Sequence, residues 1–74
     1  NPATLIKFDI AKPEFVTLRI YDITGRLVKT AVNENLKAGS YQFNFNAEGL
    51  SSGLYIYRIK AGDFVQSKKM LFVK

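Results

Sequence analysis

The fold of this chain is decided by one stretch of sequence, Phe15-Val16-Thr17-Leu18-Arg19-Ile20-Tyr21-Asp22. Its apolar residues Val16, Leu18 and Ile20 share one face of an extended chain, and the more polar residues between them share the other. A period of two residues is typical of a β-strand with one face in a core and one in water. The stretch therefore predicts a half-buried strand of an antiparallel sheet, because such sheets commonly leave one face solvated.

The same alternation predicts further strands on both sides of this stretch. Leu54–Lys60 begins with apolar residues on both faces, which predicts a central strand, and Phe64–Val73 forms a long final strand. Gly62-Asp63 between them is a two-residue hairpin signal, because glycine accepts the positive φ that such turns need. The other alternating segments are Ile6–Ile10 and Ser40–Asn46.

Residues 26–37 allow two interpretations. The spacing of Val28, Val32 and Leu36 fits a helix, whereas the alternation from Val28 to Val32 fits a strand. Because the segment has no obvious helix N-cap, we expect a strand through Asn33 followed by a loop. The chain then has roughly six or seven short strands and no linker or repeat, which favours an antiparallel β-sandwich.

Length and composition indicate one small domain with one core. The chain has 74 residues, of which 47% are hydrophobic, and this argues against disorder. No apolar run is long enough to cross a membrane, so we expect no transmembrane segment. We expect the core to contain Ile6, Phe8, Val16, Leu18, Ile20, Val28, Phe43, Phe45, Tyr55, Tyr57, Ile59 and Leu71.

Several kinds of catalytic chemistry are excluded by the residues that are missing. The sequence has no His and no Cys, which rules out His-dependent triads, Cys nucleophiles, zinc sites of the Cys/His type and disulfides. The acidic residues are scattered, and we expect Asp22 and Asp63 to form turns. Ser51 and Ser52 have no base to activate them. We therefore expect no enzyme, no metal and no cofactor.

The net charge of +5 is concentrated near the C-terminus, where residues 58–74 carry five basic side chains against Asp63 alone. The pair Lys68 and Lys69 has two interpretations: lysines that block aggregation at a sheet edge, or an address that a receptor reads. Nucleic-acid binding is disfavoured, because most aromatic residues lie on the apolar side of the alternation. Tyr55 and Tyr57 share one strand face, so an accessory carbohydrate-binding module of a multidomain extracellular hydrolase is an alternative. A structural spacer module of such a protein is another.

Motifs spread along nearly the whole chain resemble a known family. Taken in order and spacing, they are similar to the C-terminal sorting domains of the type IX secretion system. The immunoglobulin-like domain of flagellar hook-capping proteins shares much of the pattern. The motifs are Asn1-Pro2-Ala3-Thr4, Tyr21-Asp22-Ile23-Thr24-Gly25-Arg26, Leu36-Lys37-Ala38-Gly39, Ser52-Gly53-Leu54-Tyr55 and Lys68-Lys69-Met70-Leu71-Phe72-Val73-Lys74.

The resemblance implies an immunoglobulin-like β-sandwich over residues 1–74 that ends a larger secreted protein of Bacteroidetes-type bacteria. An N-terminal cargo domain in the same chain would reach the periplasm by its own signal. The type IX machinery would then export the cargo for release or surface attachment, and a sortase-like peptidase would remove the sorting domain. By position, the recognition residues implied are Gly53, Tyr55, Lys68, Lys69, Leu71, Val73 and Lys74.

Overall fold

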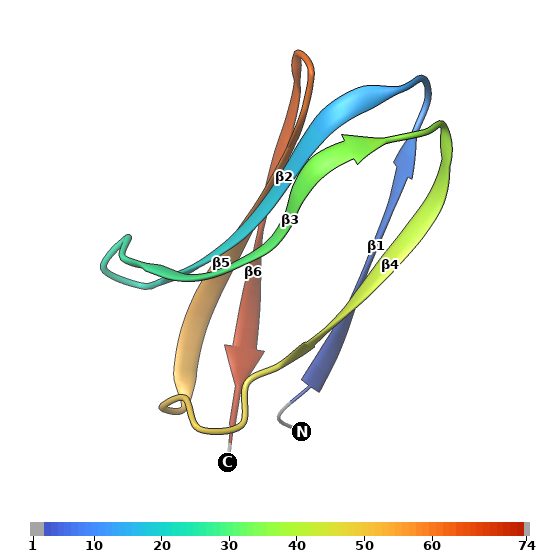
Figure 1. Ribbon diagram of the computed structural model, residues 1–74. Coiled ribbons are helices and arrows are strands. Elements are labelled where there is room, and N and C mark those ends of the chain that lie inside the picture. The colour runs from blue at the N-terminus through green and yellow to red at the C-terminus, as the bar shows by residue number, and fades with distance from the viewer. Residues whose placement is uncertain (1–2, 74) are drawn as a thin grey trace.

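Two antiparallel β-sheets face each other in the computed structural model, which describes residues 3–73 (Figure 1). One sheet has the strand order β1-β4 and the other β3-β2-β5-β6, and no helix occurs in the described part of the chain. The predicted all-β sandwich is confirmed. The strands are β1 (Ala3–Ile10), β2 (Glu14–Asp22), β3 (Leu27–Leu36), β4 (Gly39–Asn46), β5 (Gly53–Ala61) and β6 (Phe64–Phe72).

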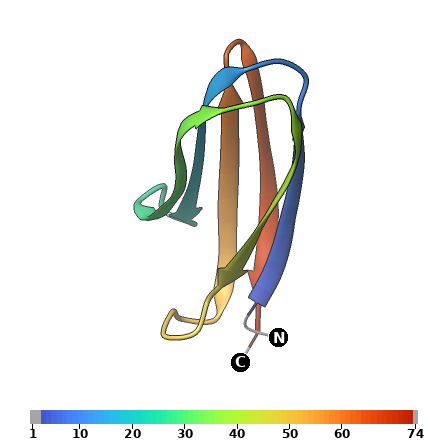
Figure 2. The same ribbon diagram turned by 45° about the vertical axis from the view of Figure 1, so that its right-hand side comes forward.

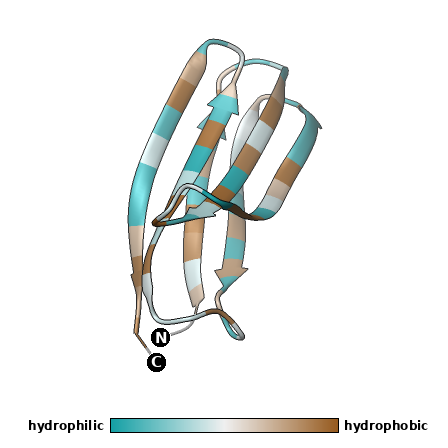
Figure 3. Cartoon of the chain, turned by 90° about the vertical axis from the view of Figure 1, so that its left-hand side faces the viewer, coloured by the Kyte–Doolittle hydropathy of each residue, from teal (hydrophilic) through white to brown (hydrophobic). Residues whose placement is uncertain are grey.

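The core lies between the sheets, and β2 contributes its centre. Val16, Leu18 and Ile20 are fully buried, and the strands of both sheets show alternating apolar and polar bands (Figure 3). Phe45 of β4 meets Phe72 of β6 edge to face, with ring centroids 5.6 Å apart, so one aromatic contact joins the two sheets. The buried residues are Ile6, Ile10, Val16, Leu18, Ile20, Phe45, Ala47, Tyr55, Ile59, Ala61, Met70 and Phe72.

One core prediction is wrong. Leu71 is 70% exposed, because Met70 and Phe72 on either side of it point into the core instead. The segment from Met70 to Val73 is apolar on both faces, so alternation alone did not indicate which side is buried. The other expected core residues are either buried or, as for Phe8, Val28, Phe43 and Tyr57, packed half-buried against the core.

The third strand is longer than expected. We predicted a strand only through Asn33, but β3 continues to Leu36, which pairs with Glu14 at the start of β2. Pairing with β2 continues past Asn33 and holds the polar residues Glu34 and Asn35 in the sheet. The β2–β3 register shifts at two places, and such irregularities insert residues that break strict alternation. This explains why apolar residues in β3 lack a clean period of two.

The predicted hairpin between β5 and β6 is confirmed. Ala61 pairs with Phe64 on either side of the turn, and Gly62 has a φ of +60°. No residue other than glycine has a positive φ in the described part of the chain, so Asp63 keeps a negative φ. A positive φ at the first central residue alone is the pattern of a type II′ turn, which matches the twist of the two strands. The last two strands therefore form one continuous ribbon (Figure 2).

Asp22 organises the turn between β2 and β3, as expected. Its Oδ1 accepts hydrogen bonds from the backbone N–H groups of Thr24 and Arg26, each at 3.0 Å, and from the Thr24 hydroxyl at 2.6 Å. The Thr24 hydroxyl and the Arg26 N–H hold the pKa of the Asp22 carboxyl below its ordinary value of 3.8. Gly25, with a φ of 89°, completes the turn.

The lowered pKa of Asp22 predicts an acid-dependent contribution to stability. Replacing Asp22 with Asn should reduce the free energy of unfolding at pH 7, where the wild-type carboxylate is charged. This deficit should shrink as the pH falls below 3.8 and through the lower pKa of the folded protein, because the wild type then loses the same charge. Urea unfolding of both proteins across this pH range tests it, and a deficit that is constant with pH would contradict it.

The burial pattern predicts opposite outcomes for two leucines. Leu18→Ala should lower the free energy of unfolding by about 2–5 kcal/mol, because it opens a cavity in the centre of the core. Leu71→Ala should change it by only about 0.5 kcal/mol or less, because that side chain lies in solvent. Chemical denaturation measures both values, and a large loss for Leu71→Ala would restore the original core prediction.

Candidate functional site

The predicted recognition residues come together on two adjacent strands. Gly53 begins β5 and pairs with Phe72, so the start of β5 lies beside the end of β6. Lys74 lies outside the described residues. The predicted residues that the structure places are Gly53 and Tyr55 on β5, Lys68, Lys69 and Leu71 on β6, and Val73 directly after it.

The last strand, β6, lies at the edge of the four-stranded sheet, and no other strand among residues 3–73 pairs with its outer side (Figures 1 and 2). In a two-residue hairpin the flanking residues form a hydrogen-bonded pair, and such pairs alternate along the ladder. The ladder that starts at Ala61 and Phe64 therefore directs the backbone of even-numbered β6 residues toward β5. The N–H and C=O groups of Val65, Ser67, Lys69 and Leu71 face the open edge.

The side chains of the same odd-numbered residues form an exposed row on the outer face of the sheet. We call Lys69, Leu71 and Val73 the outer row. Leu71 and Val73 are 70% and 63% exposed. The row continues onto β5, where Leu54 lies opposite Leu71 and Ile56 lies opposite Lys69. Apolar surface, a cation and unpaired backbone groups are thus available together along one edge.

Lys68 points to the opposite face from Lys69. It pairs with Tyr57 and shares the core-facing side of β6 with Gln66 and Phe64, yet all three β6 residues are exposed. This side is open because the facing sheet has two strands against four in the sheet that contains β6. Strand order between distant segments decides this coverage, so the sequence pattern could not predict it.

Tyr55 is part of the core and stabilises the start of β5. Tyr55 is 6% exposed, and its hydroxyl donates a hydrogen bond to the Ser51 carbonyl at 2.7 Å. Its ring also lies 5.6 Å from that of Phe72. These contacts hold the segment before β5 against the end of β6. Because Tyr55 is buried, it does not form an exposed aromatic platform with Tyr57, which weakens the carbohydrate-binding alternative.

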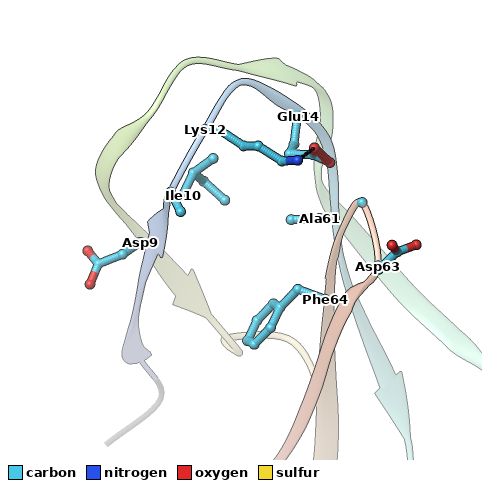
Figure 4. Close-up of a pocket in the computed structure, with 9 residues that line it drawn as sticks. Asp9, Ile10, Lys12, Glu14, Ala61, Asp63 and Phe64 are labelled. Atoms are coloured by element: carbon cyan, nitrogen blue, oxygen red, sulfur yellow. Dashed lines mark ion pairs between the residues drawn. The ribbon is translucent and has the colours of Figure 1, made fainter.

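A pocket of about 660 Å³ lies at the other end of the sandwich, beside the β5–β6 turn (Figure 4). Its apolar wall includes Ile10 and Phe64, while Asp9 and Asp63 point away from each other on opposite sides of the opening. Glu14 is occupied by an ion pair with Lys12 at 4.0 Å. The carboxylates do not converge, so the pocket lacks the paired acids of a hydrolytic site. None of the predicted recognition residues lines it.

Residues 3–73 contain neither a cluster of metal-ligating side chains nor a helix that could span a membrane. No group of three or more metal-ligating side chains gathers in this part of the chain. Nor does it contain a helix of the length and hydropathy that a membrane crossing requires.

The described residues thus form a small β-sandwich that presents an open strand edge and an exposed row of side chains, both of which a partner can reach. The model of the secretion system C-terminal sorting domain family matches residues 1–74, and the chain belongs to this family. It is a sorting signal of type IX secretion, joined to a cargo and recognised by the type IX machinery for export to the surface or the medium. No curated protein and no solved structure matches the chain.

Proposed function

We propose that this domain, as the last domain of a larger protein, takes an N-terminal cargo domain from the periplasm across the outer membrane. The cargo is then released or attached to the cell surface, and a sortase-like peptidase removes the sorting domain. The domain itself carries out no catalysis. The open edge of β6, with Leu71 and Val73 exposed beside it, is the observation that carries this proposal.

In this proposal the receptor adds a strand to the open edge of β6. Main-chain hydrogen bonds to the edge-facing groups of Ser67, Lys69 and Leu71 give affinity, as in other cases of β-strand addition. Burying Leu71 completely contributes about 1.5–3 kcal/mol, whereas each exposed ion pair of a lysine contributes about 0–1 kcal/mol. The apolar row and the backbone therefore dominate affinity, and the lysines select the partner.

The positions of the two lysines define the partner strand further. Lys68 and Lys69 are consecutive, so their side chains flank the edge on opposite faces of the sheet. A receptor strand with two consecutive acidic residues places one carboxylate on each face, opposite one lysine on each face. If the lysines instead only prevent edge-to-edge aggregation, as edge lysines do elsewhere, export does not depend on them.

An export assay tests the role of the lysines. A fluorescent reporter with an N-terminal export signal is fused ahead of residues 1–74 and expressed in a type IX-competent strain and in a strain that lacks the translocon. The wild-type fusion should reach the surface or medium only in the competent strain. Lys68→Glu/Lys69→Glu should leave the domain folded and keep the reporter in the periplasm. A Lys7→Glu/Lys37→Glu fusion, with the same charge change elsewhere, should be exported normally.

Two results would count against this proposal. Equal periplasmic retention of the folded wild-type fusion in both strains would exclude the sorting role of this domain. Normal export of Lys68→Glu/Lys69→Glu would show that the lysines are no part of the address. Circular dichroism of each purified domain separates these results from a failure to fold.

Replacing Ser67 with proline tests the strand-addition mechanism separately. The Ser67 N–H faces the open edge, so proline removes an edge donor and keeps the hydrogen bonds to β5. We expect the folded variant to be exported at least about ten-fold less, because proline also obstructs an incoming strand. Ser67→Thr, which keeps the N–H, is the matched control. Wild-type export of a folded Ser67→Pro domain would exclude pairing at this edge.

A further inference from the structure

The outer face of the four-stranded sheet brings together three cations from two strands, β2 and β5. Arg19 of β2 lies directly opposite Arg58 of β5. Lys60 lies opposite Thr17 and is therefore the diagonal neighbour of Arg19 across the same strand pair. Diagonal neighbours in an antiparallel pair are about 7–8 Å apart, within reach of long side chains. We call Arg19, Arg58 and Lys60 the basic triad.

The basic triad has no counter-ion in the described part of the chain. The ion pairs there involve Lys12 with Glu14 and Arg26 with Asp22, and neither includes a member of the triad. The outward-facing residues of β2, β5 and β6 include no acid. Like charges directly opposite each other destabilise a sheet, so the Arg19–Arg58 pair opposes folding. The stability of the fold therefore gives no reason for two arginines to lie opposite each other at this position.

The triad borders a shallow depression of about 180 Å³ lined by Thr17, Arg19, Tyr21, Arg58 and Lys60. We propose that this depression binds a doubly charged tetrahedral oxyanion, the phosphate group of a ligand. The guanidinium forks of Arg19 and Arg58 can each donate two parallel hydrogen bonds to phosphate oxygens, and Lys60 adds a third cation. The hydroxyl groups of Thr17 and Tyr21 supply further donors.

The number of cations favours phosphate over a carboxylate. Three converging positive charges balance a dianion better than a single negative charge, and they repel one another until an anion occupies the depression. The site lies on the face of β2 and β5, whereas the proposed receptor strand approaches the edge of β6. Phosphate binding is therefore independent of the proposed sorting mechanism.

The test is a titration of the 74-residue domain with inorganic phosphate in a phosphate-free buffer, followed by amide NMR shifts. Saturable shifts should appear at residues 17–21 and 58–60. Sodium chloride and sodium acetate, at matched ionic strength, should not reproduce them. Arg58→Gln should weaken phosphate binding about ten-fold or more, since it removes one charge-assisted fork. Lys37→Gln, an equal charge change away from the face, should bind as the wild type does.

Thermal unfolding provides a second measurement. Phosphate should raise the unfolding temperature of the wild type more than chloride does at equal ionic strength, because a ligand of the folded state stabilises it. Arg58→Gln should be more stable than the wild type in low salt, since the like-charge pair is gone. Equal stabilisation by chloride and phosphate would show that the rise in unfolding temperature comes only from screening of the repulsion between the cations, and it would overturn the proposal.

The source of the phosphate group is resolved with vesicles. Phosphatidylcholine vesicles that contain phosphatidic acid should retain the wild type, but not Arg58→Gln, if the group belongs to a lipid headgroup. Absence of retention, together with binding of inorganic phosphate, assigns the site to a soluble phosphate-bearing ligand. Retention that Arg58→Gln does not reduce, or binding of a polyglutamate peptide as tight as that of phosphate, would overturn the proposal.

Discussion

Burial of one face of β2 is the constraint on which the rest of the structure depends. Val16, Leu18 and Ile20 have no solvent exposure, and β2 is hydrogen-bonded to β3 on one side and β5 on the other. The two-stranded sheet must cover this apolar face, and Phe45 reaches across to Phe72 as it does so. With no cysteine in the sequence, the domain has no disulfide to supplement this burial. The placement of β6, and of every residue in the proposed sites, follows from these contacts.

Alternation predicted the strands well where one face is apolar and the other polar, as in β2. It failed to orient the end of β6, since Met70–Val73 is apolar on both faces. The two-residue turn at Gly62-Asp63 determines this orientation. Ile59 faces the core, so Ala61 does too, and Phe64 opposite it sets the even-numbered residues of β6 inward. Counting through the two-residue turn would have placed Leu71 outside. No comparable signal marks the irregular pairing of β3 with β2.

The sequence alone does not show which basic residues are neighbours in the folded domain. Residues 58–74 looked like one basic segment, but the pleat sends Lys68 to one face of the sheet and Lys69 to the other. Arg58, in contrast, meets Arg19 from a distant part of the chain. Which cations become neighbours depends on strand order and register, and these follow from packing of the whole domain. The motif resemblance supplied the family, while the fold separated residues such as Tyr55, which stabilise the sandwich, from those that a partner can reach.

The tight turn at Gly62-Asp63 also gives the end of the chain a strict parity. From Phe64 to Phe72, each residue is directed to the core-facing side or to the outer side of the sheet by whether its distance from Phe64 is even or odd. One inserted or deleted residue between the turn and Lys68 would exchange the two sets, bringing Leu71 inward and expelling Met70 and Phe72. A change of two residues would preserve the assignment. The number of residues between the turn and Lys68 can therefore change only by two at a time if Met70 and Phe72 are to stay in the core. The exposed side chains of the segment are not constrained in this way.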